Sequence, residues 1–104
     1  MFDYNLVDEI ISTIASKFHP QKIIIFGSVA SKTAHDDSDL DLLVIMDTDK
    51  KEPFRSVPVT ISVGHFFINK DIIVITPQEY ESKKNDEESM VYQIDKTGKV
   101  AYEA

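Results

Sequence analysis

The sequence has no cysteine and a single arginine in 104 residues. Without cysteine the chain cannot form a disulfide, a thiolate nucleophile or a cysteine-based zinc site. Neither G-x-G-x-x-G nor G-K-[ST] occurs, so dinucleotide-binding and P-loop interpretations are poor. No apolar run approaches membrane-spanning length, and the N-terminus lacks the charged-then-apolar form of a secretory signal. We therefore expect a soluble cytoplasmic protein.

Basic residues are also scarce. Lysine and arginine total 11 against 18 aspartates and glutamates, which gives a net charge of −7. Non-specific nucleic-acid binding and membrane-surface binding both rely on basic surface, so the charge argues against direct contact with either. The length fits one domain, spanning residues 1–104, with a modest core.

Hydrophobic periodicity and capping residues predict an alternation of helices and strands. The expected elements at the N-terminal side are a helix capped by Asp3 or Asn5 and ended by Pro20, and strands over 23–26 and 38–46, the second buried over 42–46. They are followed by a strand over 71–75, a helix opening with the Thr76–Glu79 capping box, a last helix closed by Gly98, and a short strand or tail over 100–102.

Residues 54–67 fit two structures. The alternation of Val57, Val59, Ile61 and Val63 is typical of a strand. A helix would instead begin at Ser56, with a proline in its first turn, and would have Val57, Ile61 and His65 on one side. The residue pattern leaves both open. The single arginine, in this segment, is expected in an exposed ion pair rather than on a phosphate.

The segment over residues 23–46 contains the groups that suggest chemistry. An apolar strand ends at Gly27-Ser28, and a second strand opens with Asp39 and Asp41, two residues apart. Side chains alternate along a strand, so these carboxylates are expected on the same side. Like charges held so close favour protonation of one or a bound cation, and paired carboxylates often share Mg²⁺ where phosphates are handled.

The Gly-Ser turn predicts a phosphate site beside these acids. Gly27 permits a tight turn and close approach of a ligand to the backbone. Ser28 is expected at the N-terminus of a short helix, where free N–H groups favour an anion. A phosphate cradle next to an acidic metal site indicates phosphoryl or nucleotidyl transfer.

Gly27-Ser28-Val29-Ala30 followed by Ser38-Asp39-Leu40-Asp41-Leu42 resembles the glycine-serine and aspartate-x-aspartate signature of the DNA polymerase β-like nucleotidyltransferases. The size is similar to that of the minimal nucleotidyltransferases of prokaryotes. The resemblance implies an α/β (α+β) fold, a small mixed β-sheet with helices packed on it, and a helix within residues 54–67. It also implies a third carboxylate, matched by Asp71, which heads an apolar strand where an unpartnered charge is costly.

The same resemblance implies ATP as substrate and two Mg²⁺ ions held by Asp39, Asp41 and Asp71. Gly27 and Ser28 would hold the outgoing phosphates. Lys32 could reach the triphosphate or could equally be a solvated lysine, and a second glycine is common near this position in the family. Asp36 and Asp37 are expected to be solvated loop charges rather than ligands.

Antitoxins that pair with a small helical HEPN ribonuclease are similar in size, and this likeness implies AMP transfer to a tyrosine of such a toxin, within a homo- or hetero-oligomer. Two alternatives stay open. One is a non-catalytic, partner-binding antitoxin module with a degenerate transferase fold. The other is a transferase that acts on a small molecule such as an aminoglycoside, with the acceptor pocket completed by a second copy of the chain.

Overall fold

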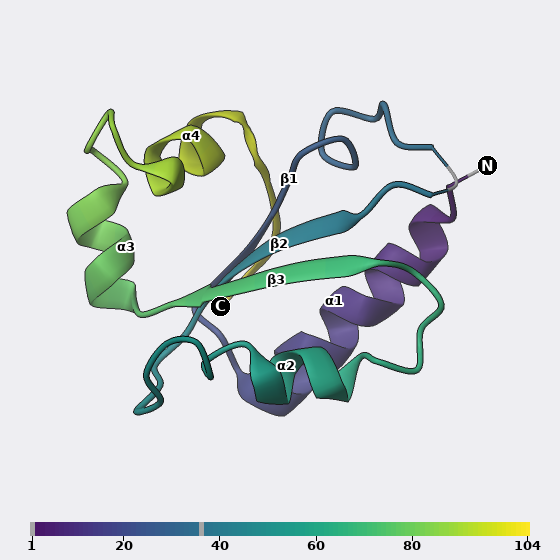
Figure 1. The fold of residues 1–104 in the computed structure, drawn as a ribbon, viewed down its shortest axis with the longest axis horizontal. Coiled ribbons are helices and arrows are strands. Elements are labelled where there is room, and N and C mark those ends of the chain that lie inside the picture. Colours follow the sequence, from purple (N-terminus) through teal and green to yellow (C-terminus); the bar gives the residue numbers. More distant parts are fainter. Residues whose placement is uncertain (1, 36) are drawn as a thin grey trace.

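A computed structural model describes residues 2–35 and 37–104, and its centre is a four-stranded mixed sheet (Figure 1). The strands are β1 (Lys22–Phe26), β2 (Leu40–Ile45), β3 (Lys70–Ile75) and β4 (Lys99–Glu103), in the spatial order β3-β2-β1-β4. β1 pairs antiparallel with both β2 and β4, whereas β2 and β3 are parallel. The expected small mixed sheet is confirmed.

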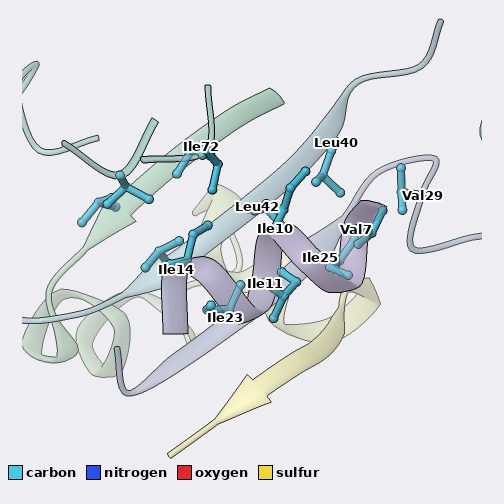
Figure 2. Close-up of a cluster of buried hydrophobic side chains, with 14 of the residues drawn as sticks. Val7, Ile10, Ile11, Ile14, Ile23, Ile25, Val29, Leu40, Leu42 and Ile72 are labelled. Atoms are coloured by element: carbon cyan, nitrogen blue, oxygen red, sulfur yellow. The ribbon is translucent and has the colours of Figure 1, made fainter. Parts of the chain in front are cut away.

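The first face of the sheet is covered by α1 (Tyr4–Phe18) and α2 (Val57–Ser62). Figure 2 shows this cluster, in which Ile10 and Ile14 of α1 lie beside strand residues such as Leu42 and Ile23. The helix α1 begins as predicted, with the Asp3 carboxylate accepting hydrogen bonds from the N–H groups of residues 5 and 6.

The second face is covered by α3 (Pro77–Lys83) and α4 (Met90–Thr97). Tyr80, Val91 and Ile94 from these helices pack on Leu43 and Ile45 of β2. The predicted capping box is present, because Thr76 Oγ1 accepts from Glu79 N–H at 3.2 Å and Glu79 Oε1 accepts from Thr76 N–H at 2.8 Å.

Residues 54–67 contain the helix α2, so the helical alternative is correct and the strand alternative is wrong. Val57 and Ile61 share one side of this helix, as expected, and that side faces outward. Val59 and Val63 are fully buried, whereas Val57 and Ile61 are 45% and 72% exposed. A helix this short turns one stripe inward, and the stripe at 59 and 63 meets the core.

Arg55 forms hydrogen bonds and an ion pair with other residues of the fold. Its guanidinium donates to Glu79 Oε1 at 2.6 Å and to the carbonyl of Lys50 at 2.9 Å. The side chain is only 17% exposed, so the expected ion pair exists but is half-buried rather than on the surface. It ties the loop after β2 to the start of α3, away from the strand ends that bear Asp41 and Asp71.

Within residues 2–35 and 37–104, no helix combines the length and the apolar character needed to cross a membrane.

The phenol of Tyr80 generates a prediction about stability at high pH. Tyr80 is 4% exposed and donates to Asp95 Oδ1, and loss of solvent, followed by that hydrogen bond, raises its pKa to about 12. An unfolded tyrosine titrates near pH 10, so this contribution to stability is complete below pH 10 and is lost as pH rises through about 12. The loss should be on the order of 2–3 kcal/mol.

Chemical denaturation of wild type and Tyr80→Phe at several pH values checks this. Lysines also titrate in this range, so the quantity to compare is the difference between the two proteins. That difference should shrink from pH 9.5 to pH 12, and a constant difference would contradict the assignment.

Candidate active site at the acidic end of the sheet

Asp41 and Asp71 lie directly opposite one another. Each is the second residue of its strand, and the parallel register of β2 and β3 pairs them. Neighbouring strands are about 4.8 Å apart, and paired residues in a parallel ladder point to the same face. That face is the second one, because Leu43 and Ile45 lie on the same side of β2 as Asp41 and pack under α3 and α4.

Asp39 comes just before β2, one residue short of the strand on which it was expected. It is exposed, as is Asp71, whereas Asp41 is half-buried. Loss of solvent raises the pKa of Asp41, and the negative charges of Asp71 and then Asp39 raise it further. The fold therefore brings the three predicted acids into one neighbourhood, where they repel one another.

The three carboxylates are close enough to interact, but they are not arranged around one metal-ion position. In the part of the chain that the structure describes, no three histidine, cysteine, aspartate or glutamate side chains are arranged to hold one metal ion. The donor chemistry nevertheless fits a hard divalent cation, since all three groups offer carboxylate oxygens and a bound cation would relieve the repulsion at Asp41.

Gly27 begins the turn that follows β1, and it lies beside the Asp41 carboxylate. Phe26, the last residue of β1, pairs with Asp41, so the next residue passes beside the carboxylate. Gly27 has φ +76°, and a Cβ built on it would overlap Asp41 Oδ2. Glycine is needed here both for the left-handed backbone and for the space that the carboxylate occupies.

Residues 27–33 form consecutive hydrogen-bonded turns, and the predicted short helix after Ser28 is wrong. Ser31 N–H donates to Gly27 O at 3.2 Å, and Thr33 N–H donates to Ser28 O at 2.9 Å. Lys32, at φ +64°, leaves the right-handed region and prevents a helix from continuing. Val29 is 4% exposed and anchors the turn in the core beside Val7 and Ile25 (Figure 2).

The left-handed position at Lys32 gives a physical reason for the glycine that the resembling family commonly has near it. The Lys32 side chain is exposed. Its ammonium lies 4.9 Å from the ring centroid of Tyr4, on the α1 side of the turn. The prediction that Lys32 contacts a triphosphate is left to experiment.

A cleft of about 820 Å³ lies between α1, the turn and β4. Val29 and Lys32 line it from the turn, and Tyr4 and Tyr102 line it from the two ends of the sequence. Asp39, Asp41 and Asp71 do not line it. Sequence reasoning missed this cleft because its walls are far apart in the chain and have no shared motif.

Two hydrogen bonds between His35 and Ser38 close the loop before β2. Ser38 Oγ accepts from His35 N–H at 2.7 Å, and Ser38 N–H donates to His35 O at 3.0 Å. Asp37 is exposed, consistent with a solvated charge. The prediction for Asp36 lies outside the described residues.

Comparisons with known proteins establish the class. The sequence model of the family described as "Polymerase beta, Nucleotidyltransferase" matches residues 8–104, so the chain belongs to this family. A search of curated protein sequences found no significant match.

Two solved structures share the fold. One, from Sulfolobus solfataricus and provisionally named a nucleotidyltransferase, has TM-score 0.64 and 24% identity, and the match covers 95% of this chain and 78% of that one. The other comes from a toxin-antitoxin crystal structure with AMP-PNP. It has TM-score 0.64 and 20% identity, with 93% and 73% of the two chains covered.

The contact between Gly27 and Asp41 predicts that Gly27→Ala is destabilising. Alanine would have to adopt a left-handed backbone, at a cost of roughly 1–2 kcal/mol, and its Cβ would push the Asp41 carboxylate away. Thermal unfolding should show a melting temperature lower by several degrees.

Gly64→Ala is the matched control, because a Cβ there would meet only ordinary contacts, the nearest at 3.4 Å. It should change the melting temperature little. Equal effects of the two substitutions would refute the special role given to Gly27.

Proposed function

We propose that this chain is an Mg²⁺-dependent nucleotidyltransferase that transfers AMP from ATP to a hydroxyl group, the acceptor being a tyrosine of a partner HEPN-type ribonuclease toxin. The observation that carries the proposal is the register of β2 and β3, which sets Asp41 opposite Asp71 next to the Gly27 turn. Membership of the nucleotidyltransferase family supports the reaction class.

The proposed reaction is a single displacement at phosphorus. The acceptor hydroxyl oxygen bonds to the α-phosphorus of ATP, the α–β bridging P–O bond breaks, and pyrophosphate leaves. The hydroxyl proton passes to the Asp71 carboxylate or, through it, to water. Such a transfer requires alignment and charge neutralisation rather than a covalent protein intermediate.

The acids and the turn would divide these tasks. Asp39 and Asp41 would hold both Mg²⁺ ions and Asp71 the one on the acceptor side; when bound, the ions supply positive charge at the phosphates and the acceptor oxygen. Gly27 and Ser28 would orient the outgoing phosphates through the backbone and hydroxyl of the turn. Lys32 would add a positive charge only if it leaves Tyr4.

Two observations support a protein acceptor. A structural neighbour of this chain comes from a toxin-antitoxin complex. The chain carries a net charge of −7, which favours a partner with a basic surface. The proposal is accordingly a hetero-oligomer of this chain with its acceptor.

A non-catalytic partner-binding module is the second candidate. It is favoured by the left-handed Lys32, whose ammonium rests on Tyr4, and by the lack of a finished metal cage in the described residues. Such a module has no need of Mg²⁺ or ATP. Binding of ATP that depends on Mg²⁺ would therefore count against it.

Label transfer tests the enzyme directly. With ATP labelled at the α-phosphate, the chain should label a partner tyrosine in the presence of Mg²⁺. Asp41→Asn and Asp71→Asn should each reduce the rate by roughly 100-fold or more, because each removes charge that the reaction needs.

Asp49→Asn is the control for the loss of one acid, since Asp49 is exposed and follows the opposite end of β2. It should transfer label at the wild-type rate. Undiminished transfer by Asp41→Asn would remove the mechanism.

Thermal unfolding provides a test that does not depend on activity. Mg²⁺ at ten times its dissociation constant should stabilise the wild type by about 1.4 kcal/mol, which raises the melting temperature by several degrees. Without Mg²⁺, Asp41→Asn should be more stable than the wild type, because it removes the repulsion from Asp71 and Asp39.

In the same measurement, Asp41→Asn should not respond to Mg²⁺, whereas Asp49→Asn should respond fully. A full response by Asp41→Asn would place the cation elsewhere.

A further inference from the structure

The segment from Phe54 to Phe67 exposes an unusual amount of apolar surface. In the described part of the chain, six large apolar side chains are exposed, and four of them fall in this segment. They are Phe54 (62% exposed), Val57 (45%), Ile61 (72%) and Phe67 (99%), here called the α2 surface. Val57 and Ile61 are one helical turn apart, so they share the outward side of α2.

Charged residues are missing from α2 and from the residues that follow it, up to β3. Residues 56–69 contain no aspartate, glutamate, lysine or arginine, although 28% of the chain is charged. Depletion of charge together with enrichment in phenylalanine is the compositional mark of the core of a protein interface, whereas a solvated helix carries charges outward. The α2 surface therefore has the composition of a contact surface.

Phe67 is held outward by a braced turn. Ile68 N–H donates to Phe66 O at 2.9 Å, which makes Phe67 the central residue of a three-residue turn. Lys70 Nζ donates to the carbonyls on both sides, to Phe66 O at 3.0 Å and to Ile68 O at 2.8 Å. A fully exposed aromatic side chain on a fixed backbone loses little backbone entropy on binding.

The braced turn leads straight to the candidate active site. Leu40 N–H donates to Asn69 O at 2.7 Å, so the sheet pairing begins two residues after Phe67, and Asp71 follows two residues later. A protein docked on Phe67 would thus lie at the end of the sheet where β3 and Asp71 begin, although α2 covers the first face and the Asp71 side chain points to the second. The position suits a partner that must present a hydroxyl group there.

We propose that the α2 surface is the docking site for the acceptor protein, with Phe67 and Ile61 as its anchors; the inference rests on the proposed function. The partner is a protein with an apolar pocket and a basic surface around it, which suits an apolar, uncharged segment that is followed four residues later by Asp71 in a chain of charge −7. A second copy is disfavoured, because a two-fold interface opposes the same surface to itself and brings two chains of charge −7 together.

The experiment compares Phe67→Ser/Ile61→Ser with a control that also replaces two exposed apolar residues, Met90→Ser/Val100→Ser, which are 55% and 49% exposed and lie outside the α2 surface. The probe is the protein encoded by the adjacent gene, purified separately. Transfer of α-phosphate label is measured over a range of its concentrations, and complex formation is measured by light scattering.

The anchor variant should raise the KM for the protein acceptor roughly 10–100-fold, with kcat at saturating acceptor and Mg²⁺-dependent ATP binding unchanged. The control variant should behave as wild type. Phe67→Leu should recover most of the affinity, because it restores an apolar anchor.

The outcomes separate the two proposals. If wild type transfers label and the anchor variant matches it in KM, docking at the α2 surface is wrong and the proposed function stands. If wild type forms the complex without transferring label, and the anchor variant loses the complex, docking stands and the transferase proposal fails. A wild-type homodimer that the anchor variant converts to monomer would overturn the docking proposal in favour of self-association, and wild type that neither binds nor labels the acceptor would overturn both.

Discussion

Parallel pairing of β2 with β3 is the constraint on which the candidate active site depends. Four apolar pairs, from Leu42 opposite Ile72 to Ile45 opposite Ile75, follow the pair formed by Asp41 and Asp71. A slip of one residue would turn every one of these side chains to the wrong face of the sheet. The buried part of the ladder therefore holds two like charges opposite one another, and the pKa of Asp41 is raised first by its burial and then by the charge of Asp71.

Unequal covering of the two faces explains why this end of the sheet is available for chemistry. The buried apolar side chains of the first face lie under α1 and α2. On the second face α3 and α4 pack over Leu43 and Ile45, while the beginnings of β2 and β3 stay partly or fully exposed. The carboxylates and the Gly27 turn thus meet solvent beside a closed core, and Val29 fixes the turn to that core.

Local patterns predicted much of the fold. The Asp3 cap, the Thr76–Glu79 capping box and the apolar strands act within a few residues, so the sequence pattern was sufficient for each. One local prediction failed: Lys32 takes a left-handed backbone, and residues 27–33 form turns in place of the short helix expected after Ser28. The residue pattern did not decide which side of α2 faces inward; Val59 faces the core because α1 and β3 lie on that side.

The sequence by itself determined the kinds of groups present: acids at the starts of two apolar strands, a glycine able to turn sharply, and an uncharged stretch around α2. These depend on residue type and short spacing, which are visible without coordinates. Only the tertiary structure decided which of these groups meet. Strand register set Asp71 against Asp41, a missing Cβ let Gly27 touch that carboxylate, and packing of one helical stripe left the other, with Phe67 beyond it, facing water. Contacts between residues thirty positions apart arise from the pairing of whole strands, which no short pattern encodes.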